Sequence, residues 1–237
     1  MQKKILLIGS SSNLGRKILC EKSNYKFLTP SSTKVDILNI SKIENYIKKN
    51  KPLYILHLAG LSDPMTQHKK KIGESIKKNI IGTANLSLIA NKFNIKLIYT
   101  STNFVYPGDK GNFSENDSLL PFNNYGWSKL GGESSVMMLK KFLIIRLCLA
   151  KSPYKHKIAF TNYTTSFLSD KNVAKTILLL LKKSGVINVG GKTQSAYNYA
   201  INEGHSVIGK KMRVGNSYEI GINTSINTKK LKILLKS

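Results

Sequence analysis

The stretch Lys3-Lys-Ile-Leu-Leu-Ile-Gly-Ser-Ser-Ser-Asn-Leu-Gly15 decides the fold of this chain. Its apolar part, Lys3–Gly9, ends in a glycine, which predicts a buried parallel strand. A tight turn at Gly9 then leads into a predicted helix over Asn13–Glu21. A glycine at position 15 lets that helix pack close to the sheet, so that its N-terminus presents N–H groups to a pyrophosphate. We predict a dinucleotide-binding turn, in which Ser12 replaces the middle glycine of the usual pattern.

Strands and helices alternate regularly after this turn. Apolar runs bounded by turn residues predict strands over Tyr25–Thr29, Leu53–Ala59, Ile95–Ser101, Phe142–Leu149 and Gly185–Gly190. Helices are predicted from the capping box Ser41-Lys-Ile-Glu44 to about Asn50, from about Gly73 to Lys92, and from about Tyr125 onward. This alternation predicts an α/β fold in which helices cover both faces of a doubly wound parallel sheet of the Rossmann type.

The regular alternation weakens beyond Ala150. The pattern of residues 151–169 predicts only a weak strand or a loop. The remaining helices are expected from a cap at Ser169 or Asp170 to about Lys183, from a cap at Ser195 to about Asn202, and over Asn227–Leu235. We therefore predict an NAD(P)-binding core over residues 1–150. A small, reduced C-terminal substrate-binding lobe over residues 151–237 is interleaved with the core and adds at least one strand to it.

The charge balance is strongly basic. The formal net charge is +26, from 38 Lys and Arg against 12 Asp and Glu. Only Arg16, Arg146 and Arg213 are arginines, whereas nucleic-acid surfaces draw on arginine for bidentate contacts. The lysines spread over nearly every predicted helix, so we expect solvated faces and no specific nucleic-acid partner. A basic field of this kind would still steer anionic small molecules.

Several other classes of protein are disfavoured. The longest wholly apolar run, Ile177–Leu181, is far too short to span a bilayer, so no membrane partner is expected. Cys20 and Cys148 predict no disulfide framework, and we expect both as buried thiols in a reducing cytoplasm. The histidines are scattered and no Cys/His spacing resembles a metal site, so no metal is expected.

The segment Tyr125-Gly-Trp-Ser-Lys129 carries the strongest chemical signal. Four residues apart on a helix, the phenol oxygen and the ammonium share one face. A phenol with an ordinary pKa of about 10 is a poor acid at neutral pH, and lowering it by about three units needs roughly 4 kcal/mol of preferential stabilisation of the phenolate. An adjacent ammonium and a cationic cofactor ring would supply it, in a partly desolvated pocket where these charges act more strongly on the phenolate. We therefore predict that Tyr125 is a general acid tuned by Lys129.

Hydroxyl side chains end the preceding strand at Thr100-Ser-Thr102. Open α/β sheets bind ligands at the carboxyl ends of their strands. A hydroxyl there donates a hydrogen bond to a substrate carbonyl and polarises it for hydride attack. Ser101 and Thr102 are therefore candidate site residues, whereas His57, inside the third strand, is expected to serve packing.

The end of the second strand indicates the cofactor. An NAD-specific site carries an acidic residue there for the ribose 2′-OH. This chain instead has Thr29, Ser31, Ser32 and Lys34, which would meet a 2′-phosphate. NADP(H) is therefore favoured as cofactor, and NAD(H) stays open.

With these residues in place, the chain resembles the extended short-chain dehydrogenase/reductases, and within them the dTDP-4-dehydrorhamnose reductase branch. The matching pieces span nearly the whole chain. They are Leu7-Ile-Gly9 to Gly15, Asp36-Ile-Leu, His57-Leu-Ala-Gly60, Asn79-Ile-Ile-Gly-Thr-Ala-Asn-Leu86, Ser101-Thr-Asn-Phe-Val-Tyr106-Pro-Gly, Tyr125-Gly-Trp-Ser-Lys129, Ile145-Arg146, Ile187-Asn-Val-Gly190 and Asn227-Thr-Lys-Lys-Leu231.

The resemblance implies a set of cofactor contacts along the first four strands. The diphosphate would meet Ser12, Asn13 and Leu14, in the turn formed between Gly9 and Gly15. Asp36 and Ile37 would border the adenine, Ala59, Gly60 and Leu61 would line the ribose, and Thr100 would flank the nicotinamide.

The resemblance also implies the catalytic roles. Thr102 would bind the keto oxygen of the substrate, with Asn103 beside it, and Tyr125 would donate the proton. Lys129 would hold the nicotinamide ribose and tune Tyr125. Hydride from NAD(P)H would reduce a 4-keto-6-deoxyhexose attached to a nucleoside diphosphate.

Three departures from the reductase pattern concern the substrate side. Asn103 stands where the pattern has Asp, Leu149 stands near the place of an aromatic residue that contacts substrate, and the segment from Ala150 to Asp170 is short. Related dehydratases carry an Asp-Glu pair after the catalytic Thr, and Asn103-Phe104 lacks those carboxylates. A nucleotide-sugar 4-epimerase and a non-catalytic NAD(P)-binding regulatory subunit remain alternatives to a reductase, and a homodimer stays open.

Overall fold

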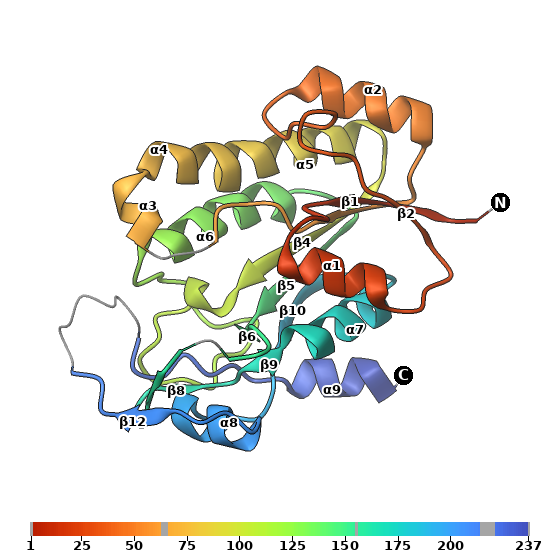
Figure 1. Ribbon diagram of the computed structural model, residues 1–237. Coiled ribbons are helices and arrows are strands. Elements are labelled where there is room, and N and C mark those ends of the chain that lie inside the picture. Colours follow the sequence, from red (N-terminus) through yellow and green to blue (C-terminus); the bar gives the residue numbers. More distant parts are fainter. Residues whose placement is uncertain (1, 63–65, 155, 214–220, 237) are drawn as a thin grey trace.

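The computed structural model describes residues 2–62, 66–154, 156–213 and 221–236, and over these residues six parallel strands form the central sheet (Figure 1). The strand order is β2-β1-β3-β4-β5-β10, and every neighbouring pair is parallel. The strands are β1 (Lys4–Ile8), β2 (Lys26–Leu28), β3 (Tyr54–His57), β4 (Lys96–Thr102), β5 (Phe142–Leu147) and β10 (Gly185–Val189). The predicted α/β fold with a parallel sheet is confirmed.

The order of the strands reverses beside β1. The chain passes from β1 to β2 on one side and then crosses back to β3 on the other side. In an open α/β sheet such a switch point leaves a crevice at the carboxyl ends of the strands, where ligands bind. The predicted turn after β1 and the hydroxyl-bearing end of β4 both lie at this edge.

Helices cover both faces of the sheet because neighbouring strand residues point to opposite sides. In β1, Ile5 and Leu7 pack with α1 (Asn13–Cys20), α7 (Asp170–Leu180) and α9 (Lys229–Lys236). On the other face, Leu6 and Ile8 pack with α2 (Ile40–Asn50), α5 (Gly82–Lys92) and α6 (Asn124–Met137). The first set lies below the sheet in Figure 1 and the second above it. Fully burying one such aliphatic side chain contributes roughly 1.5–3 kcal/mol.

Side-chain caps fix where the helices begin. Asn39 caps α2 by accepting a hydrogen bond from the backbone N–H of Lys42, so the capping box predicted at Ser41 is wrong. The helix therefore begins at Ile40, because the side-chain amide oxygen of Asn39 binds a backbone N–H of the first turn that has no partner within the helix. Ser195 caps α8 (Ala196–Asn202), as predicted. Of the two caps predicted for α7, the structure has Ser169.

The long helix predicted over Gly73–Lys92 is present from Ile72 to Lys92, and it contains a π-helical segment. The chain forms α3 (Thr66–Lys70), then α4 (Ile72–Ser75), a π-helical segment over Ile76–Ile81, and finally α5. Segments with π-helical hydrogen bonding are frequent at functional sites. The buried Asn79 lies inside this one.

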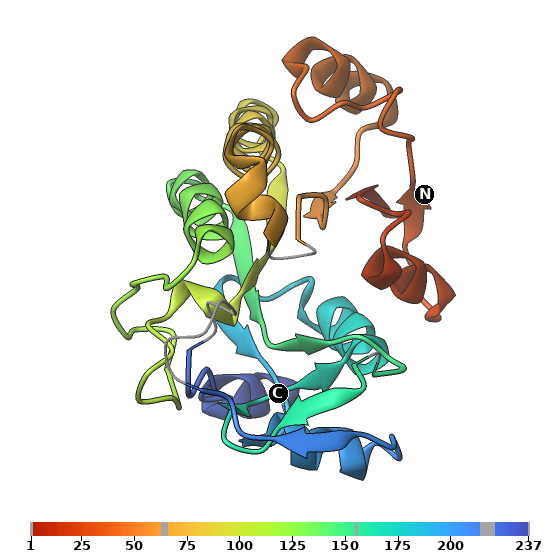
Figure 2. The same cartoon turned by 60° about the vertical axis from the view of Figure 1, so that its left-hand side comes forward.

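Residues beyond Ala150 contribute to the main sheet and to small ladders. β10, α7 and α9 complete the sheet and one of its faces. The ladders pair β6 (Leu149–Ala150) with β9 (Leu168–Ser169), β7 (Ile158–Phe160) with β12 (Ile208–Lys210), and β8 (Thr164–Thr165) with β11 (Gln194–Ser195). Figures 1 and 2 show β12 and α8 at the bottom of the molecule, away from α2 and α5.

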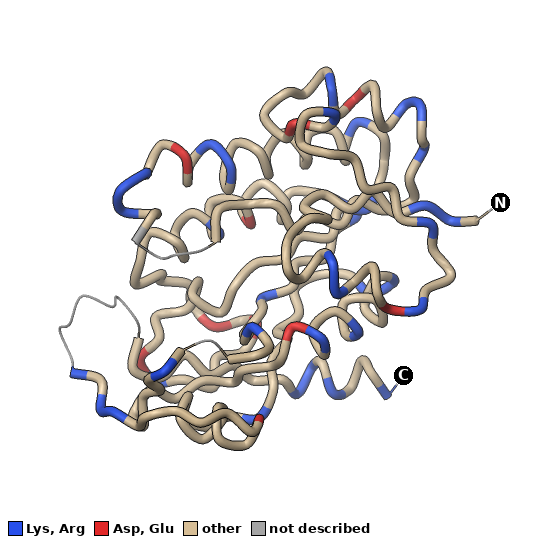
Figure 3. The backbone as a smooth tube through the Cα atoms, in the orientation of Figure 1, with Lys and Arg blue, Asp and Glu red and all other residues tan. Residues whose placement is uncertain are grey.

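The surface agrees with the dispersed charge read from the sequence. Lys and Arg are spread over most of the backbone trace in Figure 3. Cys148 is buried as expected, but Cys20 is exposed, because the last residue of α1 faces solvent. Within the described residues, no helix has the length and apolarity needed to cross a membrane. The same part of the chain holds no group of three or more metal-ligating side chains.

Candidate active site

The turn after β1 requires both of its glycines. Gly9 has φ +91°, and a Cβ there would lie 2.7 Å from the backbone N of Ala59. A Cβ on Gly15 would lie 2.5 Å from the carbonyl oxygen of Gly9. Ser12 caps α1, and its hydroxyl accepts a hydrogen bond from the N–H of Gly15 at 3.0 Å. A strand, a close turn and a capped helix of this kind fit a dinucleotide diphosphate.

The first residues of α1 contact the rest of the fold. Asn13 donates a side-chain hydrogen bond to the buried carboxylate of Asp170, the first residue of α7. Leu14 packs its side chain into the core below the sheet. Any contact of Leu14 with a diphosphate would therefore use its backbone.

The residues expected near the adenine follow β2. Asp36 accepts a hydrogen bond from the N–H of Leu38 at 2.9 Å. The carbonyl of Ile37 accepts one from the Asn85 amide at 2.9 Å. Thr29, Ser31, Ser32 and Lys34 are all exposed, as binding of a phosphate from solvent requires.

The segment Ala59-Gly60-Leu61 after β3 is tied to the start of α6 by Asn79. The Asn79 amide accepts from the N–H of Leu61 at 2.7 Å, and it donates to the carbonyl of Leu61 at 2.9 Å and to the Ser128 hydroxyl at 2.8 Å. Ser128 in turn donates to the carbonyl of Tyr125 at 2.8 Å. Asn79 links the expected ribose site to the expected proton donor. No local pattern in the sequence indicates this role, because the partners of Asn79 lie 18 and 49 residues away.

Tyr125 and Lys129 occupy the first turns of α6. Asn123 caps this helix through the N–H of Gly126 at 2.8 Å, so the helix begins just before Tyr125. The Tyr125 ring is partly buried and packs against His68, with ring centroids 5.0 Å apart. The Lys129 ammonium lies 4.1 Å from the centroid of the Tyr99 ring, a favourable cation–π arrangement.

Burial governs the pKa of Lys129. The side chain is 6% exposed, and desolvation lowers its pKa to about 7, against the attraction of Glu133 that raises it. The Lys129 side chain therefore changes its charge near neutral pH. A buried side chain whose pKa is shifted toward neutrality is typical of groups that act in catalysis.

The end of β4 presents three hydroxyls. Thr100 donates to the carbonyl of His57 at 3.1 Å. The Ser101 hydroxyl is buried and has no hydrogen-bond partner among the described residues. The Thr102 hydroxyl accepts from the N–H of Phe104 at 3.3 Å and donates to the Asn103 amide oxygen at 3.4 Å.

Asn103 is directed toward the C-terminal part of the chain. Its side-chain amide donates to the carbonyl of Thr224 at 2.9 Å, and the residue is 4% exposed. This contact fastens the C-terminal segment beside Thr102. A substrate contact by Asn103 stays a prediction.

Two buried histidines, His57 and His68, lie close to Tyr125 and Lys129. His57 bonds to Thr83 at 3.0 Å, and burial, followed by the charge of Lys129, lowers its pKa to about 3. This neutral, packed state agrees with the role expected from sequence. His68, which the sequence did not single out, bonds through Nδ1 to Ser75 at 2.8 Å.

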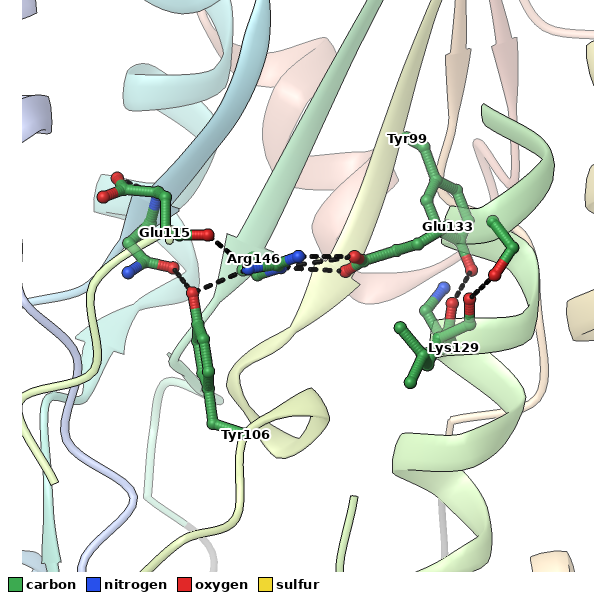
Figure 4. Close-up of polar contacts among 9 residues, drawn as sticks. Tyr99, Tyr106, Glu115, Lys129, Glu133 and Arg146 are labelled. Atoms are coloured by element: carbon green, nitrogen blue, oxygen red, sulfur yellow. Dashed lines mark hydrogen bonds and ion pairs between the residues drawn. The ribbon is translucent and has the colours of Figure 1, made fainter. Parts of the chain in front are cut away.

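A buried ion pair lies one turn beyond Lys129 (Figure 4). Glu133 accepts from Arg146 of β5, with 2.9 Å between Nη2 and Oε2. Arg146 Nη1 also donates to the Tyr106 hydroxyl at 2.8 Å, and that hydroxyl donates to Asn188 at 2.9 Å. The pair joins α6 to β5 beneath the site.

Comparison with known proteins identifies the family. The sequence profile of the RmlD substrate binding domain matches residues 3–189. The chain belongs to the RmlD substrate binding domain family. This RmlD-domain chain is 28% identical over 228 residues to dTDP-4-dehydrorhamnose reductase of Aggregatibacter actinomycetemcomitans, covering 92% of the chain and 71% of that protein. It is 27% identical over 144 residues to methionine adenosyltransferase 2 subunit beta of Rattus norvegicus, covering 57% of the chain and 43% of that protein.

Solved structures share the fold of the RmlD-domain chain. Bacillus anthracis dTDP-4-dehydrorhamnose reductase, solved in complex with NADP, superposes with a TM-score of 0.87 at 20% identity, covering 98% of the chain and 92% of that structure. Bordetella bronchiseptica WbmG, in complex with NAD and UDP, superposes with a TM-score of 0.78 at 17% identity, covering 100% of the chain and 89% of that structure. The predicted family is confirmed by the RmlD-domain match, and the proteins of similar sequence and fold include dTDP-4-dehydrorhamnose reductases.

Proposed function

We propose that the protein reduces the keto group of a nucleotide-linked 4-keto-6-deoxysugar with NAD(P)H. The observation that carries the proposal is the buried Lys129, one turn along α6 from Tyr125, whose ammonium lies over the Tyr99 ring of β4. The carboxyl end of that strand carries the hydroxyls of Thr100, Ser101 and Thr102. The glycine turn after β1 lies at the same edge of the sheet. A proton donor, a carbonyl-binding hydroxyl and a dinucleotide turn are the parts that a carbonyl reduction needs.

Each residue of the candidate site has a role in this reaction. Thr102 redirects its hydroxyl proton from Asn103 to the keto oxygen and polarises the carbonyl. Tyr125 donates a proton to that oxygen as negative charge develops on it. Charged Lys129 stabilises the phenolate that remains, which lowers the pKa of Tyr125. Bound NAD(P)H supplies the hydride.

We infer that the cofactor lies along the carboxyl edge from β2 to β4. Gly9, Ser12, Asn13, Leu14 and Gly15 would hold the diphosphate, and Asp36 and Ile37 the adenine. Ala59, Gly60, Leu61 and Thr100 would line the ribose and nicotinamide, with Lys129 on the nicotinamide ribose. The exposed Ser31, Ser32 and Lys34 favour NADPH, and the reductase of similar fold from Bacillus anthracis was solved with NADP.

The substrate assignment rests on the relatives and on charge. The similar protein of Aggregatibacter actinomycetemcomitans is a dTDP-4-dehydrorhamnose reductase. The net charge of +26 would attract the diphosphate of such a substrate. We assign substrate contacts to Thr102, Asn103 and the lobe over residues 151–237. A cytoplasmic location and a homodimer remain predictions.

A second candidate is a binding subunit that retains the fold. The similarity to methionine adenosyltransferase 2 subunit beta favours it. A cofactor-depletion assay with dTDP-4-dehydrorhamnose separates the candidates. Net NADPH consumption supports the reductase, conversion of the sugar without net consumption indicates a 4-epimerase, and neither result, with NADPH bound, indicates a binding subunit.

A further inference from the structure

Lys129 and Glu133 lie one helical turn apart on the buried face of α6. Lys129 is 6% exposed and Glu133 is 1% exposed. A buried ammonium is costly unless an opposite charge compensates it. At a spacing of four residues on a helix, the Glu133 carboxylate is the neighbouring charge on the same face.

The Glu133 carboxylate is fixed in place by Arg146. Arg146 Nε lies 3.2 Å and 3.3 Å from the two carboxylate oxygens, and Nη2 lies 2.9 Å from Oε2. The guanidinium is itself anchored by the Tyr106 hydroxyl at 2.8 Å and the carbonyl of Glu115 at 3.2 Å. Figure 4 shows this chain of contacts running from Glu115 through Arg146 to Glu133, with Lys129 on the next turn of α6.

Among the described residues, the titratable groups around Lys129 come from four elements. Tyr125 and Glu133 lie on α6, Tyr99 on β4, His57 on β3 and His68 on α3. Burial lowers the pKa of both histidines, and it raises the pKa of Tyr99. Glu133 is thus the acidic group of this set, and its charge raises the pKa of Lys129 while burial lowers it.

We propose that Glu133 is the counter-charge that keeps Lys129 protonated. Arg146, by partly neutralising the Glu133 carboxylate, sets how strongly this carboxylate attracts the Lys129 ammonium. Glu133 acts through Lys129 and is therefore a positioning residue. The inference deepens the proposed function, on which it rests, because Lys129 helps to lower the pKa of Tyr125 in that function only while it is charged.

Removing the charge at either end of the ion pair should shift the pKa of Lys129, and the two removals should shift it in opposite directions. Glu133→Gln removes the anion and leaves Arg146 uncompensated, and both changes lower the pKa of Lys129. Arg146→Met leaves the Glu133 charge unneutralised and raises that pKa. A purely structural ion pair would give the same kind of loss in both variants and no opposite shifts.

The direct test needs neither cofactor nor turnover. The side-chain carbon next to the lysine nitrogen is followed by NMR in protein labelled with 13C-lysine, and Lys129→Met assigns the resonance that titrates near neutrality. We expect its midpoint to fall by about one pH unit in Glu133→Gln and to rise in Arg146→Met, a tenfold change in the protonation equilibrium per unit. Unchanged midpoints, or shifts of the same sign, would overturn the proposal.

A double variant keeps the test decisive if a single variant does not fold. Glu133→Gln with Arg146→Met removes both charges, and circular dichroism checks its fold. Because the anion lies one turn from Lys129 and the cation lies beyond it, the midpoint should fall below that of the unmodified protein. A midpoint at or above the unmodified value contradicts the proposal.

The pH profile of turnover separates this inference from the proposed function. Activity that needs charged Lys129 is lost as the pH rises through its pKa. The descending limb should therefore move to lower pH in Glu133→Gln and to higher pH in Arg146→Met. If the unmodified protein reduces the substrate but the limb stays fixed in both variants, only the role of Glu133 is wrong. If the unmodified protein reduces no keto sugar, the proposed function fails and the NMR titration still decides the role of Glu133.

Discussion

Replacing Gly15 by alanine should damage the candidate dinucleotide turn. The added Cβ would lie 2.5 Å from the carbonyl oxygen of Gly9 and 2.7 Å from that of Ser10. Both atoms are backbone, so the turn itself must move. Overpacking of this kind costs typically about 1–3 kcal/mol, offset in part by roughly 1 kcal/mol that alanine gains over glycine in a helix. We expect a net loss of up to about 2 kcal/mol of unfolding free energy. We also expect NADPH binding at least about tenfold weaker, equivalent to roughly 1.4 kcal/mol.

Gly73 supplies a matched control. It also lies in a helix, but a Cβ there meets nothing within 4 Å. Gly73→Ala should keep NADPH affinity and leave stability unchanged or slightly improved. Urea unfolding and a fluorescence titration with NADPH measure both variants. The reasoning is refuted if Gly15→Ala binds NADPH as tightly as Gly73→Ala and unfolds at the same urea concentration.

Three further predictions concern catalysis, cofactor choice and charge. Tyr125→Phe should lower turnover by about 10²–10⁴-fold and leave NADPH affinity nearly unchanged. Thr102→Val should lower turnover less, because it removes one hydrogen bond to the substrate carbonyl. A Tyr125→Phe variant that keeps most of its activity would point to another proton donor. NADPH should bind more tightly than NADH, and Lys34→Ala should weaken only NADPH; calorimetry that finds NADH equal or tighter contradicts this. Duplex DNA should bind weakly and dissociate as salt approaches physiological strength, and anisotropy that shows tight binding at that salt would revive a nucleic-acid role.

The sequence predicted those parts of the fold that depend on local pattern. The glycine spacing at positions 9 and 15 follows from steric limits within one turn, and the structure bears it out. The caps at Ser169 and Ser195 depend on residues three positions away. The cap of α2 was misplaced because Asn39 and Ser41 are both good caps, and the pattern does not decide between them.

The candidate site was predicted only in part, because several of its contacts join distant segments. Tyr125 and Lys129 were found from their spacing on one helix. Asn103 meets Thr224 across 121 residues, and Asn79 meets Ser128 across 49. Contacts between residues so far apart in the sequence leave no periodic pattern from which they could be predicted. The ion pair of Glu133 with Arg146 joins a helix to a strand, and its place beside Lys129 appears only once the sheet is assembled.

Transfer of deuterium from NADPH to the sugar tests the central claim most directly. NADPH carrying deuterium at the transferred position of its nicotinamide ring is incubated with the unmodified protein and dTDP-4-dehydrorhamnose, and the product is analysed by mass spectrometry and NMR. The account predicts one deuterium per product molecule, attached to the carbon that carried the keto group, and one NADPH oxidised for each. Bound NADPH with no deuterium in the sugar, for this and other nucleotide-linked 4-keto sugars, would contradict it.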